Sequence, residues 1–95
     1  MTASCIHNDE VFLRNYGEAL AKDELAVAIS EARRQHGWTQ EEAASRANVS
    51  QAYLSKLESG DANPTIGHIG AILGAWGQRL RLSVVPLKNF PVEET

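Results

Sequence analysis

Residues 39–60 read TQEEAASRANVSQAYLSKLESG, and the capping residues in this stretch predict where helices begin and end. Thr39 is followed three residues later by Glu42, which is the spacing of a capping box, so a helix is expected to begin at Gln40. Asn48 tolerates a left-handed backbone conformation and can end that helix. The first predicted helix is therefore only about two turns long.

A second short helix is predicted directly after the first. Ser50 can cap its amino end, and Gly60 supplies the position that follows its carboxyl end. Two helices of about two turns, separated by roughly three residues, form the helix-turn-helix arrangement.

The second short helix has an apolar side and a polar side. Leu54 and Leu57 can anchor it on a core, and the opposite side is polar but mostly small. Such a side can enter the major groove of B-DNA, where Gln bonds adenine, Lys bonds guanine and Ala meets a thymine methyl. The alternative is an ordinary solvated surface, but the position within a capped two-helix unit favours the groove-reading interpretation. The polar side consists of Gln51, Ala52, Ser55, Lys56 and Ser59.

From about residue 25 to residue 76 the chain resembles the Cro and phage-repressor type of helix-turn-helix, the XRE-like family. The run WTQEEAASRANVSQAYLSKLESGDANPT carries this resemblance. It implies an ion pair between Arg33 and Glu58 that ties the first helix to the recognition helix. The sequence departs from the family at Ala43, where Leu is usual, and at Asn48, where Gly is frequent; Trp38 is expected to compensate for the smaller Ala43.

The resemblance also implies a set of DNA-contacting residues. Gln40 would bond a phosphate, Gln51, Ala52 and Lys56 would face the bases, and Ser55 and Ser59 would lie at the edge of the contact. Two further residues, Ser50 and Tyr53, complete the predicted DNA-contacting set.

Further helices are expected on both sides of the motif. A short helix over residues 8–16 is predicted to end at Gly17, and a longer one then runs to about residue 36. A last helix, capped by Thr65, carries an apolar stripe from Ile66 to Trp76. Its three glycines predict close approach of a neighbouring helix: Gly67, Gly70 and Gly74.

Residues 78–86, QRLRLSVVP, alternate apolar and polar residues as a half-buried strand does. No second strand candidate exists in the sequence, so the expected partner is the same segment of a second molecule, paired antiparallel about a twofold axis. A twofold dimer also suits a reader of palindromic DNA. The alternative is a loose tail over residues 79–95. The predicted dimer interface comprises Trp76, Leu80, Leu82 and Val84.

Together these patterns predict a mainly all-α fold. Five helices form a Cro/repressor-like helix-turn-helix domain with an amino-terminal helical extension and one carboxyl-terminal β-strand that pairs across a dimer. The expected organisation is an acidic helical extension over residues 1–21, the DNA-binding domain over 22–77, and a dimerisation strand and tail over 78–95.

The formal net charge of −3 is concentrated in the first third of the chain, so the motif itself stays free to approach a polyanion. An acidic extension before a helix-turn-helix and a closing RLRLSVVPL resemble HigA-like antitoxins and, more distantly, HipB-like ones. The resemblance implies a dimer that represses its own operon and neutralises a RelE-fold ribonuclease toxin. The extension would dock on the toxin, although it could equally cover the core of its own domain. The predicted docking residues are Phe12, Leu13 and Tyr16.

No catalytic or cofactor signature is evident in the sequence. Cys5 and His7 are a poor zinc pattern without a second pair, and no triad or phosphate-cradling loop is present, so an enzyme is not expected. A single cysteine and the lack of a long apolar run suggest a reducing cytoplasm and no membrane. The leading expectation is a DNA-binding antitoxin. The alternatives are a stand-alone repressor of the same fold and a protein-interaction module that has lost DNA binding.

Overall fold

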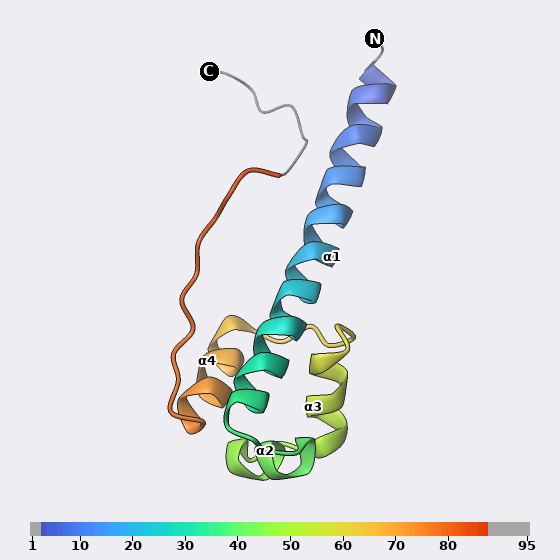
Figure 1. The fold of residues 1–95 in the computed structure, drawn as a ribbon. Helices are drawn as coiled ribbons and strands as arrows, with labels where there is room; N and C mark the ends of the chain where they lie inside the picture. The colour runs from blue at the N-terminus through green and yellow to red at the C-terminus, as the bar shows by residue number, and fades with distance from the viewer. Residues whose placement is uncertain (1–2, 88–95) are drawn as a thin grey trace.

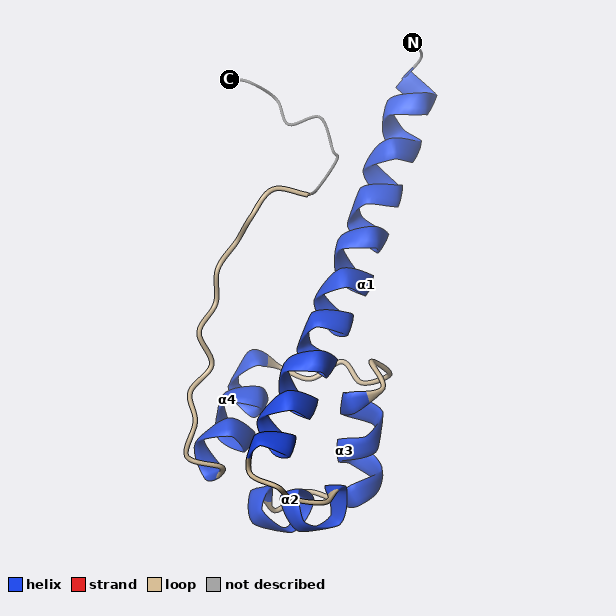
Figure 2. Cartoon of the chain, viewed as in Figure 1, coloured by secondary structure: helices blue, strands red, loops and turns tan. Residues whose placement is uncertain are grey.

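The computed structural model describes residues 3–87, with side chains described from residue 10 onward. This part of the chain contains four helices and no strand (Figures 1 and 2). The prediction of a mainly helical fold is confirmed, whereas the predicted number of five helices is wrong. Within the described helices none is long and apolar enough to cross a membrane. The helices are α1 (Ala3–Gln35), α2 (Gln40–Ala47), α3 (Gln51–Glu58) and α4 (Ile66–Ala75).

The first two predicted helices are a single helix, because α1 continues through Gly17. A Gly inside a helix costs only about 1 kcal/mol relative to Ala. The residues after it, Glu18 to Ala21, are good helix formers, and an ion pair of 3.1 Å between Glu18 and Lys22 supports the same turns. The predicted stop at Gly17 is therefore wrong. The expected boundary between residues 21 and 22 also falls inside this continuous helix.

The core lies where the carboxyl half of α1 packs on α3 and where α2 packs on α3 and α4. The large side chains that are fully buried come from α1, α3 and α4: Ile29, Leu54, Ile69 and Ile72. Burying a side chain of this size contributes about 1.5–3 kcal/mol. From α2 the core receives the smaller Ala43 and Ala44.

Trp76, which was predicted to lie in a dimer interface, belongs to the core of the single chain. It is 3% exposed, and its indole N–H donates a hydrogen bond of 3.0 Å to the backbone carbonyl of Ala43. A Trp this large can fill the space that the small Ala43 leaves. Trp38 was expected to do so; its half-buried ring packs against the core and lies edge-on to Trp76, at 6.1 Å between centroids.

The glycines of α4 do not mark a close approach within the described chain, so that interpretation is wrong here. A Cβ atom added to Gly67, Gly70 or Gly74 would meet nothing within 4 Å. All three lie on the exposed side of the helix, opposite the buried Ile69 and Ile72.

Residues 78–87 follow α4 and run back alongside α1 as an extended segment (Figure 1). The predicted strand is not formed in the single chain, because the described residues offer it no second strand. Leu80 is half-buried against the core, whereas Leu82 is 67% exposed and Val84 96% exposed. The remainder of the expected tail, residues 88–95, lies outside the described residues. A groove remains between this segment, α4 and one side of α1, and is lined in part by Gly17, Leu20, Ala21, Leu25, Ala28, Ile66 and Ile69.

The amino-terminal half of α1 projects away from the other three helices (Figure 2). Val11, Phe12 and Tyr16 are 41%, 63% and 45% exposed, and Leu13 is half-buried. The expectation that this part of the chain covers the core of its own domain is therefore wrong for these side chains. We call residues 10–20 the projecting arm.

Candidate nucleic-acid interface

The amino end of α2 is fixed by the capping box that the sequence predicts. The backbone N–H of Glu42 donates to the Thr39 hydroxyl at 3.1 Å, and the Glu42 carboxylate accepts from the Thr39 N–H at 2.8 Å. At the other end, Asn48 has φ 59° and takes the left-handed conformation that ends the helix. The capping box thereby fixes the start of α2 at Gln40, directly after the turn that links α1 to α2.

The amino end of α3 is capped by Ser50, whose hydroxyl accepts from the Tyr53 N–H at 3.0 Å. Its carboxyl end is closed by Ser59 and by Gly60, which has φ 82°. The two-helix unit thus has the boundaries that the caps predict, and the helix-turn-helix arrangement is confirmed.

The two sides of α3 divide as expected. Leu54 is 0% exposed and Leu57 is 2% exposed, so the apolar side of α3 is buried in the core. The opposite side faces outward and is made of exposed, mostly small polar residues. We call this set the α3 outer face: Gln51, Ala52, Ser55, Lys56 and Ser59.

The other two members of the predicted DNA-contacting set on this helix have structural roles. Ser50 is exposed, but its hydroxyl is occupied as the cap of α3. Tyr53 is half-buried against the core, and its ring lies 5.4 Å from the ring of His68 at the start of α4. The exposed His68 is thus a neighbour of the leading end of α3. Sequence reasoning did not connect these two residues, because they belong to different helices.

The predicted ion pair between Arg33 of α1 and Glu58 of α3 is present at 2.7 Å. The guanidinium bonds both carboxylate oxygens, through Nε to Oε2 at 2.7 Å and through Nη2 to Oε1 at 2.9 Å. Its Nη1 also donates to the Trp38 carbonyl at 2.8 Å. This fork geometry joins the end of α1, the turn that follows it and the end of α3.

Two further donors reach the same carboxylate. The Ser30 hydroxyl and the Gln40 side-chain amide each donate to Glu58 Oε1 at 3.1 Å. Gln40, predicted to bond a phosphate, is therefore partly engaged inside the protein. Ser30 was missed by the sequence analysis; the signal for it is a polar residue one turn before Arg33 on the buried side of α1.

These contacts shift the pKa values of both charged partners. Burial of Glu58, whose side chain is 6% exposed, opposes its charge. The hydrogen bonds from Arg33, Gln40 and Ser30, with the Arg33 charge, outweigh that effect and lower the pKa of Glu58. The hydrogen bond with Glu58 raises the pKa of Arg33 against the effect of burial.

The turn between α1 and α2 contains an aromatic stack. The centroids of the Trp38 and His36 rings are 4.0 Å apart, and the two rings are nearly parallel. The guanidinium carbon of Arg46 lies 4.4 Å from the centroid of the Trp38 ring. Arg46 is therefore partly committed to a cation–π contact within the chain.

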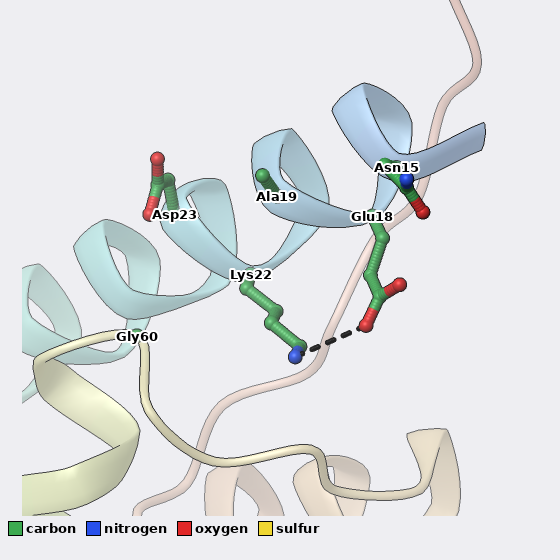
Figure 3. Close-up of a pocket in the computed structure, with 6 residues that line it drawn as sticks. All are labelled: Asn15, Glu18, Ala19, Lys22, Asp23 and Gly60. Atoms are coloured by element: carbon green, nitrogen blue, oxygen red, sulfur yellow. Dashed lines mark ion pairs between the residues drawn. The ribbon is translucent and has the colours of Figure 1, made fainter. Parts of the chain in front are cut away.

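A small polar recess lies where α1 meets the turn after α3 (Figure 3). It holds about 200 Å³ and is lined by Asn15, Glu18, Ala19, Lys22, Asp23 and Gly60. Glu18 and Lys22 pair across its edge, and a Cβ atom on Gly60 would come within 3.3 Å of the Asp23 carboxylate. The short distance between Gly60 and Asp23 shows that α1 lies close to this turn. Among the residues described, no group of three or more His, Cys, Asp or Glu side chains could hold a metal ion; the side chains of Cys5 and His7 lie outside that description.

Comparison with known proteins identifies the class of this fold. A helix-turn-helix family profile matches residues 29–77, which is just over half of the chain. The chain therefore belongs to the helix-turn-helix family. The match includes the Arg33–Glu58 contacts and the α3 outer face, and it leaves out the projecting arm and residues 78–87.

A curated relative is similar over a longer stretch. The chain is 44% identical over 63 residues to a protein of Sinorhizobium fredii (strain NBRC 101917 / NGR234) described as the uncharacterized HTH-type transcriptional regulator y4dJ. The similar part covers 66% of this chain and 75% of the relative.

Proposed function

We propose that this protein is a sequence-specific DNA-binding transcriptional regulator that inserts the α3 outer face into the major groove. The observation that carries the proposal is the division of α3, with Leu54 and Leu57 buried and Lys56 and its small polar neighbours exposed. The small side chains let the groove approach the helix closely, and Gln51, Ala52 and Lys56 supply the chemistry for reading base edges. The relative described as a transcriptional regulator supports the same role.

The amino end of α2 would contribute a phosphate contact. The Gln40 amide nitrogen has two N–H groups and uses one of them for Glu58, so the other remains for a phosphate oxygen. Phosphate contacts of this kind set the register of the protein on the duplex, while α3 reads the sequence.

Binding to the DNA upstream of the protein's own gene tests the proposal. Specific binding is expected, and the logarithm of its affinity should fall steeply with the logarithm of salt concentration, because each phosphate contact releases counterions. A shuffled fragment of equal length serves as the control. Equal affinity for both fragments would contradict sequence-specific binding, and no binding to either fragment would favour the interaction module.

The proposed regulator acts as a homodimer on a palindromic site. The supporting observation is the exposed, alternating segment with Leu82 and Val84 outward, beside an open apolar groove. Antiparallel pairing of this segment with its copy would satisfy the backbone groups along the facing edge of each segment and cover these side chains. Leu80 already contacts the core and would anchor the paired segments.

A second candidate function is that of an antitoxin that also neutralises a ribonuclease toxin. The observation that favours it is the projecting arm, where the rings of Phe12 and Tyr16 stack with 5.7 Å between their centroids and both side chains are exposed. Between residues 10 and 31 the helix carries five acidic side chains but only two basic ones, Arg14 and Lys22. This excess of negative charge complements a basic partner. Without a toxin, the same molecule is a stand-alone repressor.

The product of the adjoining reading frame separates these two functions. An antitoxin is expected to bind a small basic neighbour-encoded protein and to abolish its ribonuclease activity. Phe12→Ala with Tyr16→Ala should lose that binding and keep DNA binding, because the arm lies away from α3. If the neighbour-encoded protein does not bind, or binds the double variant equally well, the stand-alone repressor is favoured.

A further inference from the structure

The Glu58 carboxylate is held by donors from two other helices. Ser30 and Arg33 come from α1, one turn apart, and Gln40 is the first residue of α2. Oε1 accepts three hydrogen bonds, of 2.9 to 3.1 Å, and Oε2 accepts one of 2.7 Å. Glu58 is the last residue of α3, so this carboxylate fixes the end of the predicted recognition helix against the start of α2.

We propose that Ser30 and Gln40 are positioning residues for DNA binding, because they hold Glu58 where it joins the phosphate-contacting end of α2 to the base-reading helix α3. The inference rests on the proposed function and adds a task for residues that do not face the bases. Ser30 is 8% exposed, and a buried hydroxyl that lacks a partner is costly, so its bond to Glu58 is maintained.

Gln40 has a second consequence in this arrangement. One amide N–H reaches Glu58, and in the proposed complex this bond would orient the amide so that its other N–H can donate to a phosphate. The contact of α2 with the DNA backbone and the contacts of α3 with bases therefore share one anchor. Loosening the anchor changes the angle between the two helices, which weakens the specific complex more than a non-specific one.

The test compares Ser30→Ala with the wild type and with Ser45→Ala, a matched control whose exposed hydroxyl lies outside the network. Two quantities are measured below the unfolding temperature of each variant, as set by circular dichroism. They are the pKa of Glu58, from carbon-13 NMR of its side chain, and the affinity for the upstream DNA fragment. Arg33 is the charged group in direct contact with Glu58 and is retained in all variants.

In Ser30→Ala the pKa of Glu58 should rise relative to the wild type, and affinity for the upstream fragment should fall about 3- to 10-fold, with a smaller loss on shuffled DNA. Ser30→Thr keeps the hydroxyl and should restore both values. An unchanged Glu58 titration in Ser30→Ala, or a fragment affinity equal to that of Ser45→Ala, would overturn the inference.

A second variant keeps the inference testable if Ser30→Ala does not fold. Gln40→Met removes the other donor from the carboxylate and should likewise raise the pKa of Glu58; Gln40→Lys supplies a donor again and should lower it. An unaltered Glu58 titration in Gln40→Met would overturn the role of Gln40. If the wild type itself fails to bind the fragment, the proposed function fails, and the titrations still decide whether Ser30 and Gln40 hold Glu58.

Discussion

At the scale of single residues, Glu58 joins three helices, because its carboxylate on α3 accepts hydrogen bonds from α1 and α2. The side chains of Glu58 and Arg33 are 6% and 13% exposed. If one of them is removed, little water can reach the other to solvate its charge. Removing one member of a buried pair typically costs about 3–5 kcal/mol, because the remaining charge stays buried and unpaired.

The lowered pKa of Glu58 predicts how stability depends on pH. The folded value lies below the unfolded value of roughly 4.3, so the contribution of Glu58 is fully present above that value and is lost as pH falls through the folded pKa. Urea unfolding of the wild type should show this acid loss, and Glu58→Gln should show less of it over the same range. Equal acid sensitivity of both proteins would contradict the assignment.

Lys56 is the residue from which we expect the clearest effect on DNA recognition. Lys56→Ala should weaken binding to the upstream fragment by about 1–3 kcal/mol if the ammonium group reads a guanine. Binding to shuffled DNA measures the non-specific part, and Lys22→Ala on α1 is the control for loss of one positive charge. An equal loss on both DNA fragments would make Lys56 a phosphate contact.

At the scale of elements, the sequence predicts α2, α3 and α4 closely because their caps are local. Thr39, Ser50 and Thr65 each accept a backbone N–H three residues later, and Asn48 takes the left-handed conformation that its type permits. The predicted end of the longer helix at about residue 36 was also correct: α1 ends at Gln35, and Gly37 just after it has φ 76°. Each of these helix ends depends on about four or five consecutive residues, so it can be predicted from the local sequence alone.

Features that depend on distant residues were predicted less well. Gly17 permits a helix end but does not enforce one, and its backbone stays helical. Trp76 is a large apolar residue at a helix end, and its burial depends on residues far away in the sequence. Its indole N–H donates to the carbonyl of Ala43, which lies 33 residues earlier in the chain. Ser30 gains its role in the same way, from Glu58, 28 residues along the chain.

Gly17 offers a test of helix continuity at this scale. Because a Cβ atom at this position meets nothing within 4 Å, Gly17→Ala should stabilise α1 by about 0.5–1 kcal/mol and increase helical circular dichroism. Gly37→Ala is the matched control: the added Cβ also has open space, but φ is 76°, so a loss of about 1–2 kcal/mol is expected. If Gly17→Ala loses stability like the control, the helix is broken at residue 17.

At the scale of the whole molecule, the fold divides into a compact body and two extended parts that leave it side by side. The body holds the α3 outer face, while the projecting arm and residues 78–87 expose apolar side chains in its neighbourhood (Figure 1). Phe12, Leu82 and Val84 are each more than 60% exposed, which suits contacts with other molecules more than a role inside this one.

Pairing of residues 78–86 between two copies predicts a selective effect of one substitution. Leu82→Asp places a charge on the apolar row of the segment and should yield monomers in sedimentation, with weaker binding to a palindromic fragment. Ser83→Asp adds the same charge on the opposite side of the segment and should remain dimeric. A dimer that persists in Leu82→Asp would refute the pairing and would favour the loose-tail interpretation.

The central claim is that the α3 outer face enters the DNA, and amide NMR of the isotope-labelled protein during titration with the upstream fragment tests it most directly. The largest shift changes are expected at residues 50–59 and at Gln40, with little change over residues 10–20. Changes confined to the projecting arm or to residues 78–87, with α3 unaffected, would contradict the claim.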